Sequence, residues 1–416
     1  MIQKLLKHTF FRAVIWIYIA SSILSVGQYA FHLIMARMLG PQQFGVLEST
    51  ISLLYIFSIP LLTITLVIVK YVSSYKGKND LAAVHSIFLY FNKNIMLYGA
   101  VAIVILLLFS SFFVSFLHLP SQSIMVILII SFYIGLLVQL NRSVLQGLLH
   151  FSGITVTNTV ETATKILFAV GFVYLGFEVN GALFAIALGG IVAYAVSFLF
   201  LKKLRTYKHG TFEKRKLFTF SLPVFLSSLS VTSLFTTDIL LVRHYFPATE
   251  AGYYAAIALF GKVIYYGVSP IVQVMFPMIS EAHAKAQKYT QYLLLSVCFT
   301  VLGAGIVATS YFLIPELMIS LLFGHTYLSI APYIGYFGIF MILYSLCSLL
   351  SSYFLSIHHT RQNVFLCIAA GLQIALIMQF HSTLLDVIFV SITVAFVLLV
   401  SLLLYYFYSV RSVQTT

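Results

Sequence analysis

Charged side chains within long apolar stretches are the residues of this sequence best able to do chemistry. Glu161 and Lys165 lie in one apolar stretch, and Lys262 lies in another. A charge inside a membrane costs about 2.5–3.5 kcal/mol on insertion scales, so each such residue is a functional candidate. Two ammonium groups that face one cavity would suit a pyrophosphate. Lys165 and Lys262 are therefore predicted to bind such a group, with Glu161 holding Lys165 while the site is empty.

A second interpretation of the two lysines needs no ligand. Glu161 precedes Lys165 by four residues, which is the favourable order for an ion pair within one helix. Lys262 has no obvious partner nearby in the sequence, and its long side chain would extend along the helix to the membrane surface. In this interpretation the two lysines are unrelated.

Four further charges lie near the ends of apolar stretches. Glu48 and Asp238 are carboxylates, and Arg37 and Arg243 lie close to them in the sequence. Both carboxylates are candidate functional groups. Glu48 could instead pair with Arg37 or reach the membrane interface, and Asp238 could pair with Arg243.

The stretch from about Leu217 to Val242 is unusually rich in hydroxyl groups. Small hydroxyl residues also serve helix packing in membranes, so two interpretations stand. The number of hydroxyls exceeds what close packing needs and favours the wall of a polar cavity. The hydroxyl residues are Ser221, Ser227, Ser228, Ser230, Thr232, Ser233, Thr236 and Thr237.

The elements that must position these residues are membrane-spanning helices. Hydrophobic residues make up 61% of the 416 residues and charged residues 8%, against about 25% in soluble domains. The net charge of +13 lies mainly in short loops, which favours a membrane surface over nucleic acid as partner. The predicted spans cover about residues 13–38, 44–69, 94–117, 123–145, 153–175, 181–201, 217–242, 253–279, 291–314, 327–352, 363–380 and 385–408.

An internal repeat divides these twelve spans into two sets of six. Arg37–Gly45 and Arg243–Gly252 each carry Arg, then Pro four residues on, then Gly, between apolar stretches. An even number of crossings per set predicts two lobes related by a pseudo-two-fold axis along the membrane normal. The predicted domains are a lobe of residues 1–201, a basic linker of residues 202–216, and a lobe of residues 217–416.

The distribution of basic residues predicts the orientation in the membrane. All but four of the 23 Lys and Arg residues fall on the side of the termini and the linker, the exceptions being Arg37, Arg243, Lys165 and Lys262. Basic loops stay in the cytoplasm. Both termini and the linker are therefore predicted to be cytoplasmic, in a multi-pass protein of the cytoplasmic membrane.

Several segments resemble the polysaccharide-unit flippases of the multidrug/oligosaccharidyl-lipid/polysaccharide exporter superfamily. Arg37–Gly45 (RMLGPQQFG) is similar to that family's loop after its first helix. Leu145–Phe151 (LQGLLHF) is similar to its cytoplasmic turn after the fourth helix, and Asp238–Tyr254 to its turn after the seventh. The Arg243 turn lacks the Leu-Gly before its Pro, so it is a looser match. The resemblance covers the whole chain.

The resemblance implies transport of lipid-linked oligosaccharides across the membrane by alternating access. The implied partners are a polyprenyl-phosphate-linked glycan, anionic lipids at the cytoplasmic face and glycan assembly proteins, with no nucleic acid, cofactor or metal. The predicted substrate-binding residues are Lys165, Lys262, Arg37, Arg243, Ser227, Ser230 and Thr237. Because the sequence has no nucleotide-binding motif, an ion gradient, the membrane potential or removal of the product is expected to drive transport. Glu48, Glu161 and Asp238 are the predicted ion-coupling residues.

Two other functions stay open at this point. A cation-coupled multidrug exporter of the same superfamily would bind cationic compounds in an apolar or acidic cavity, and the two lysines disfavour it. A membrane glycan polymerase or ligase would carry catalytic groups in a sizeable external loop. Every predicted external loop here has about a dozen residues or fewer, and the sequence shows no Gly-rich phosphate loop or His/Cys metal spacing. An enzyme is therefore not expected.

Overall fold

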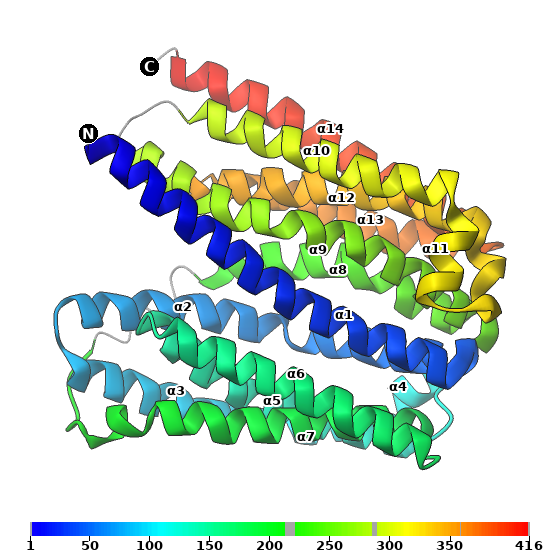
Figure 1. The fold of residues 1–416 in the computed structure, drawn as a ribbon, viewed down its shortest axis with the longest axis horizontal. Coiled ribbons are helices and arrows are strands. Elements are labelled where there is room, and N and C mark those ends of the chain that lie inside the picture. Colours follow the sequence, from blue (N-terminus) through cyan, green and yellow to red (C-terminus); the bar gives the residue numbers. More distant parts are fainter. Residues whose placement is uncertain (1, 213–220, 285–288, 358, 415–416) are drawn as a thin grey trace. The chain divides into compact units, whose positions relative to one another are not determined.

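The computed structural model describes most of the chain, namely residues 2–212, 221–284, 289–357 and 359–414. Within these residues every regular element is a helix, as the sequence predicted (Figure 1). Some of the basic residues that the sequence placed in loops lie outside the described residues. They are Lys214, Arg215, Lys216, Lys285 and Lys288.

The first helix, α1 (Ile2–Phe57), consists of two helical parts that meet at Gly40. The backbone of Gly40 has φ 70° and ψ 172°, a conformation that glycine adopts readily and other residues avoid. Pro41 follows at the start of the second part, where its missing N–H removes no helical hydrogen bond. The sequence predicted a loop over Arg37–Gly45. The structure has a break at Gly40 alone, because one glycine followed by one proline suffices to interrupt the helix.

The other helices of the first half continue without long connections. Asp80 begins one of them by accepting a hydrogen bond from the Ala83 N–H over 2.9 Å. These helices are α2 (Ile59–Gly77), α3 (Leu81–Leu108), α4 (Ser110–Phe116), α5 (Gln122–Gly147), α6 (Phe151–Tyr174), α7 (Glu178–Phe200) and the 3-10 helix η1 (Lys202–Thr206).

The second half repeats this pattern of long helices and short turns. The turn predicted around Arg243–Gly252 is Phe246–Pro247, between the first two helices of this half. The helices are α8 (Ser221–Tyr245), α9 (Ala248–Ala284), α10 (Thr290–Leu313), α11 (Pro315–Leu322), η3 (His325–Ile330), α12 (Ala331–Ser356), η4 (Thr360–Gln362), α13 (Asn363–Gln379) and α14 (Leu384–Gln414).

The chain forms two compact units. Unit 1 comprises Met1–Tyr29, Ser233–Tyr245 and Thr249–Thr416, and unit 2 comprises Ala30–Thr232 and Phe246–Ala248. In unit 1, α12 packs against both α10 and α14, and α13 packs against α14. In unit 2, α7 packs against α5 and α6, while α2 and α3 pack against α5. The lobe and linker boundaries expected from the sequence stay a prediction.

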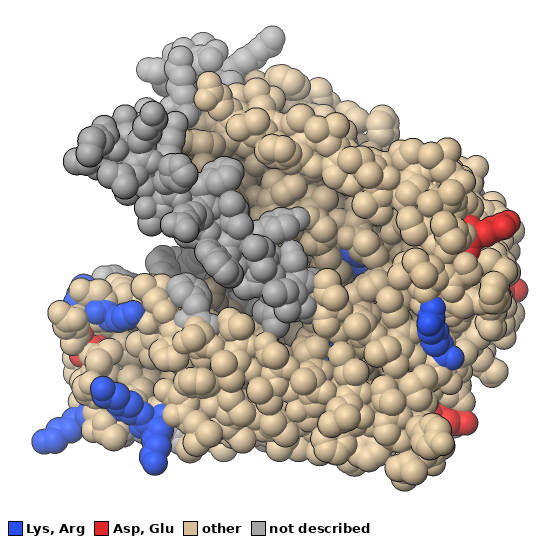
Figure 2. All heavy atoms as spheres, viewed as in Figure 1, with Lys and Arg blue, Asp and Glu red and all other residues tan. Residues whose placement is uncertain are grey.

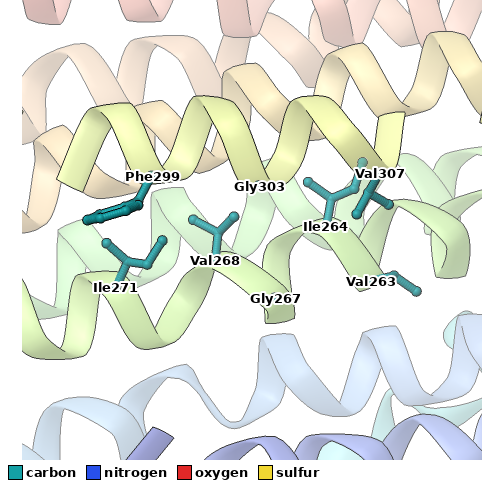
Figure 3. A pocket seen from close by; sticks show the side chains of 8 residues that line it. All are labelled: Val263, Ile264, Gly267, Val268, Ile271, Phe299, Gly303 and Val307. Atoms are coloured by element: carbon teal, nitrogen blue, oxygen red, sulfur yellow. The ribbon is translucent and has the colours of Figure 1, made fainter. Parts of the chain in front are cut away.

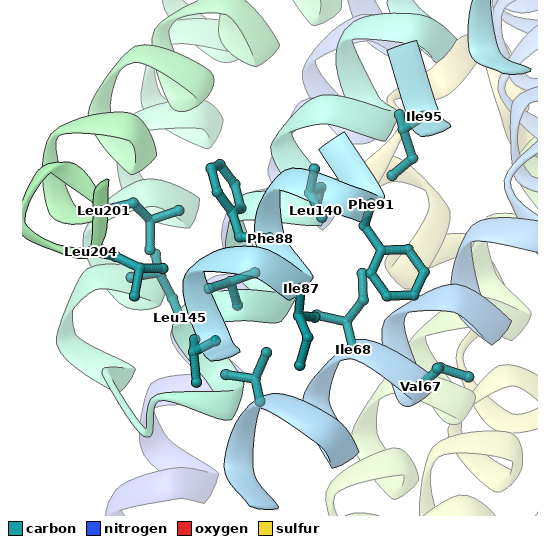
Figure 4. Packing of buried hydrophobic residues seen from close by; sticks show 13 residues of the cluster. Val67, Ile68, Ile87, Phe88, Phe91, Ile95, Leu140, Leu145, Leu201 and Leu204 are labelled. Carbon is teal, nitrogen blue, oxygen red and sulfur yellow. The ribbon is translucent and has the colours of Figure 1, made fainter. Parts of the chain in front are cut away.

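One end of unit 2 is held together by a cluster of buried aliphatic and aromatic side chains (Figure 4). Ile68 of α2, Ile87 and Phe88 of α3, and Val144 of α5 are each 1% exposed or less. Leu201, the last residue of the predicted first lobe, and Leu204, in the predicted linker, complete the cluster. Burial of side chains of this size contributes about 1.5–3 kcal/mol each, so the first turn of the linker is fixed to unit 2.

The next linker residues also lie on unit 2. The Gly210 N–H donates a hydrogen bond to the Ser86 hydroxyl over 2.8 Å, and the His209 ring stacks on His85 with centroids 5.7 Å apart. Phe212 contacts the Tyr90 ring. The segment from Lys202 to Phe212 is thus part of the folded unit rather than a free connection.

The helices have the length and composition of membrane spans. Among the described residues nine helices are long and apolar enough to cross a membrane: α3, α5, α7, α8, α9, α10, α12, α13 and α14. The sequence also predicted spans over α1, α2 and α6, and α6 carries Glu161 and Lys165, which lower its hydropathy. Exposed apolar residues such as Leu97 and Leu108 suit contact with lipid. The face in view in Figure 2 accordingly shows charged side chains at only a few places.

Candidate functional site

A cluster of charged residues in unit 2 surrounds Lys165. This lysine lies in α6, and only 8% of its surface is exposed. Its ammonium nitrogen lies 4.4 Å from the centroid of the Phe31 ring, a cation–π contact. The carboxylates of Glu161 and Glu48 both attract the ammonium electrostatically. Lys165 is therefore enclosed by protein, with negative charge contributed by α1 and by α6.

Glu48 is held by a residue on the other side of the break at Gly40. Its carboxylate is fully buried, at 0% exposure, and forms a hydrogen-bonded pair with Nδ1 of His32. The possibility that Glu48 reaches the membrane interface is therefore wrong. Because His32 and Glu48 lie in different parts of α1, the bend at Gly40 brings them together.

Glu161 pairs with Arg142 of α5 as well as attracting Lys165. Nη2 of Arg142 donates to the Glu161 carboxylate, and the two side chains are 16% and 24% exposed. The count of basic residues assigned Arg142 to the side of the termini, and the structure places it inside α5, near the end of this helix. The predicted ion pair with Lys165 within α6 is therefore not the only interaction of Glu161. Its carboxylate also forms an ion pair with Arg142 of the neighbouring helix α5.

A corresponding cluster in unit 1 surrounds Lys262 of α9. Only 3% of Lys262 is exposed, and its ammonium lies 5.7 Å from the centroid of the Phe235 ring in α8. Asp238, one turn further along α8, attracts Lys262 electrostatically. The expectation that Lys262 extends to the membrane surface is wrong, because neighbouring helices of unit 1 bury it.

Asp238 is fixed by hydrogen bonds. The Tyr254 hydroxyl donates to its Oδ2 over 2.8 Å, and the Ile239 N–H donates to its Oδ1 over 2.9 Å. From the sequence, Arg243 was one candidate partner of Asp238, and the structure shows the Tyr254 hydroxyl of α9 bonded to this carboxylate. A hydroxyl donor orients the carboxylate without neutralising its charge, so Asp238 stays available to balance Lys262.

The two clusters are built alike. Each places a buried lysine over a Phe ring and beside a buried carboxylate, which another side chain, His32 or Tyr254, hydrogen-bonds. Each lysine also lies fourteen residues after the first residue of its helix, about 21 Å along the axis at 1.5 Å per residue. Half of a membrane core is about 15 Å thick. Both lysines thus lie well inside their helices.

The other predicted site residues lie on α1 and α8. Arg37 is exposed, and Arg243 is 4% exposed near the end of α8. Ser227 and Ser230 are buried, and the Ser230 hydroxyl donates to the Leu226 carbonyl of its own helix over 2.8 Å. The Thr237 and Ser233 hydroxyls share a hydrogen bond of 2.9 Å. These bonds within α8 suit helix packing, and a role of these hydroxyls in a cavity wall stays a prediction.

The residues that sequence reasoning missed are Phe31, His32, Phe235, Tyr254 and Arg142. Four of them come from a helix other than the one that carries their partner, and His32 lies across the break in α1. His32 carried a detectable signal, because a histidine inside an apolar stretch is unusual. Aromatic residues are too frequent in this chain, at 16%, for Phe31 or Phe235 to be singled out.

An apolar groove lies between α9 and α10 of unit 1 (Figure 3). It has a volume of about 420 Å³, and Gly267 and Gly303 leave space in its walls. Aliphatic and aromatic side chains such as Ile264, Val268 and Phe299 form the remaining lining. The groove offers no charge for an anionic group, so the two lysine clusters are the better candidate site.

Comparison with known proteins identifies both a family and a fold. A family model described as "Polysaccharide biosynthesis protein" matches residues 10–283, well over half of the chain. No match was found among curated proteins.

Solved structures share the fold at low identity. A multidrug resistance MATE transporter of the MOP superfamily, in an inward-facing conformation, has a TM-score of 0.77 at 13% identity, covering 94% of this chain and 96% of that one. The lipid II flippase MurJ, in an inward closed conformation, has a TM-score of 0.69 at 14% identity, covering 93% and 87%. A MOP superfamily transporter from Pyrococcus furiosus has 0.67 at 15%, covering 94% and 95%. The chain therefore has the all-α, multi-pass membrane fold of these proteins.

Proposed function

Because the chain belongs to the polysaccharide biosynthesis protein family, we propose that it flips lipid-linked oligosaccharides or polysaccharide repeat units across the cytoplasmic membrane. One observation supports this function most strongly. Each unit holds a buried lysine over a Phe ring and beside a carboxylate. A buried cation is costly inside a membrane protein and marks a substrate or ion pathway.

The headgroup of the substrate fits this chemistry. A polyprenyl-linked glycan carries a phosphate or pyrophosphate, and ammonium groups form strong charge-assisted hydrogen bonds with phosphate oxygens. Its polyprenyl tail is apolar and can remain in the bilayer. Lys165 and Lys262 bind the phosphate groups in this proposal, with Arg37, Arg243 and the hydroxyls of α8 (Ser227, Ser230 and Thr237) contributing further contacts.

The carboxylates couple binding to an ion gradient. Beside Lys262 the Asp238 charge balances the ammonium, and beside Lys165 the Glu48 and Glu161 charges do the same. When a proton or metal cation neutralises one of these carboxylates, the cluster gains one positive charge. An anionic headgroup then binds more tightly, and by linkage the headgroup raises the affinity for the ion equally.

Alternating access needs two lobes that move against each other. In this proposal the chain has twelve spans in two lobes of six, related by a pseudo-two-fold axis along the membrane normal. Both termini and the linker are cytoplasmic, and exposed basic residues such as Lys202, Lys203 and Lys208 contact anionic lipids there. Glycan assembly proteins are further candidate partners.

A multidrug exporter is the alternative that a specific observation favours, since a MATE transporter shares the fold. Such an exporter would bind cationic compounds. The buried ammonium groups of Lys165 and Lys262 would repel a cation in either unit, whereas they attract a phosphate. The clusters therefore favour the anionic lipid substrate.

Reconstitution into liposomes tests the proposed function. The probe is a fluorescent polyprenyl diphosphate that carries a disaccharide, and a membrane-impermeant quencher reports which leaflet it occupies. We expect the protein to speed its movement between leaflets, and to leave the distribution of tetraphenylphosphonium unchanged under a pH gradient. Flipping no faster than in protein-free liposomes, or export of the lipophilic cation, would contradict the proposal.

A further inference from the structure

A group of aromatic rings in unit 1 lies next to the Lys262 cluster. The Phe235 ring of α8 lies 5.1 Å from the Tyr265 ring of α9 and 5.5 Å from the Tyr344 ring of α12, centroid to centroid. The Tyr265 and Tyr344 rings are 5.4 Å apart, so the three rings form a closed triangle from three helices. Tyr266 adjoins Tyr265 at 5.7 Å. We call these four residues the aromatic platform.

The platform is not fully enclosed. Phe235, Tyr265 and Tyr266 are partly exposed, whereas Tyr344, at 4% exposure, lies buried behind them. Tyr265 is held by a side-chain hydrogen bond with Ser348. Phe235, Tyr265 and Tyr266 therefore leave part of an aromatic surface uncovered beside a buried charge.

The platform and the charged cluster share helix faces. Tyr265 and Tyr266 follow Lys262 by three and four residues, so they lie one helical turn away, about 5 Å along α9. Phe235 precedes Asp238 by three residues on α8 and also lies beneath the Lys262 ammonium. A ligand that contacts Lys262 therefore has aromatic faces directly beside it.

Sugars are suited to such a surface. One face of a pyranose ring presents C–H groups, which carry a small positive charge and rest on the negative face of an aromatic ring. The ring edge presents hydroxyls, which hydrogen-bond to carboxylates and phenols, and Asp238 and the tyrosines supply both. In a lipid-linked glycan the first sugar is bonded to the terminal phosphate, so its binding surface must adjoin the phosphate contact.

We infer that the aromatic platform stacks the first sugar ring of the lipid-linked glycan while Lys262 binds the adjoining phosphate. This inference rests on the proposed function and assigns unit 1 the recognition of sugar. In unit 2 the arrangement differs, because among the described residues the ring partner of Phe31 is the imidazole of His32. The inference therefore concerns the Lys262 cluster of unit 1 alone.

Binding of two probes by the detergent-solubilised full chain tests the inference. One probe is undecaprenyl diphosphate, and the other is undecaprenyl diphosphate that carries a single N-acetylhexosamine. We expect the wild-type protein to bind the sugar-bearing probe about tenfold more tightly. Tyr265→Leu and Phe235→Leu should each reduce this preference by about three- to tenfold, while affinity for the sugar-free probe changes by less than about twofold.

Three controls separate the ring from other effects. Tyr265→Phe removes the hydroxyl but keeps the ring, so it should retain the sugar preference. Tyr336→Leu removes a ring of α12 that is 38% exposed and contacts Phe312 and Phe389 instead of the platform, so it should bind as the wild type does. Lys262→Gln should weaken binding of both probes. Tyr266→Leu replaces either leucine variant that does not fold.

The outcomes distinguish the inference from the function on which it rests. If the wild type binds both probes equally, or if the Phe235→Leu/Tyr265→Leu double variant keeps the full sugar preference, the platform has no role in sugar recognition. If the wild type binds neither probe, the proposed function itself fails, and the inference fails with it.

Discussion

Gly189 of α7 lies directly against Lys165 of α6. A β-carbon at position 189 would lie 3.3 Å from Cβ of Lys165 and 3.0 Å from the backbone oxygen of Glu161. Both distances are shorter than ordinary contacts, so the absence of a side chain at Gly189 sets the distance between the two helices. The position of the Lys165 cluster therefore depends on a residue that carries no functional group.

A larger residue at position 189 should impair transport without removing any charge. We expect Gly189→Leu to push α6 from α7 and to reduce flipping by at least tenfold, because displacements of about 1 Å at a binding site have effects of this size. Gly171→Leu is the matched control, since no atom lies within 4 Å of a β-carbon at that position. Equal flipping rates of the two variants in liposomes would show that the α6–α7 distance is unimportant.

The Arg142–Glu161 pair should stabilise unit 2. Arg142→Gln or Glu161→Gln leaves a partly buried charge without its partner, and we expect each to lower stability by about 1–3 kcal/mol. The exchanged pair Arg142→Glu/Glu161→Arg should recover part of this loss. Thermal unfolding in detergent measures all four proteins, and additive losses in the exchanged variant would show that the two residues do not interact.

The bend in α1 should depend on glycine at position 40. An alanine with φ 70° and ψ 172° would cost about 1–3 kcal/mol, so Gly40→Ala should lower the unfolding temperature and separate His32 from Glu48. Gly77→Ala is the comparison, because a β-carbon there meets no atom within 4 Å and Gly77 has no positive φ. A Gly40→Ala protein as stable and as active as Gly77→Ala would contradict the role of the bend.

The orientation can be tested by labelling in a chain whose native Cys298, Cys347 and Cys367 are replaced by Ser. Lys208 and Glu250 are both exposed, and the proposed topology places them on opposite sides of the membrane. An impermeant maleimide should label Glu250→Cys on intact cells and Lys208→Cys only after permeabilisation. The reverse pattern would show that the termini and linker are external.

Sequence alone predicted the elements well because their signal is local. Apolar stretches predicted the helices, and Gly40 followed by Pro41 predicted the break in α1. Charges are rare in such stretches, so Lys165, Lys262, Glu48 and Asp238 could be singled out without a structure.

Partners between helices could not be predicted in the same way. His32, Tyr254 and Arg142 meet their carboxylates only because helix packing, or the bend at Gly40, brings them there. Proximity in sequence suggested Arg243 as a partner of Asp238, whereas Tyr254, which bonds to Asp238, comes from the neighbouring helix α9. The aromatic platform was equally hidden, since its rings come from three helices of a chain rich in aromatic residues.

The most direct test of the account is flipping of the polyprenyl diphosphate disaccharide by lysine variants at matched protein levels. Lys165→Gln and Lys262→Gln should each reduce the rate by about tenfold or more, because each removes a charge-assisted contact with phosphate. Lys165→Arg and Lys262→Arg should retain part of the rate, and Lys203→Gln, which removes an exposed linker charge, should retain all of it. Wild-type flipping by the Lys165→Gln/Lys262→Gln double variant would remove both lysines from the mechanism.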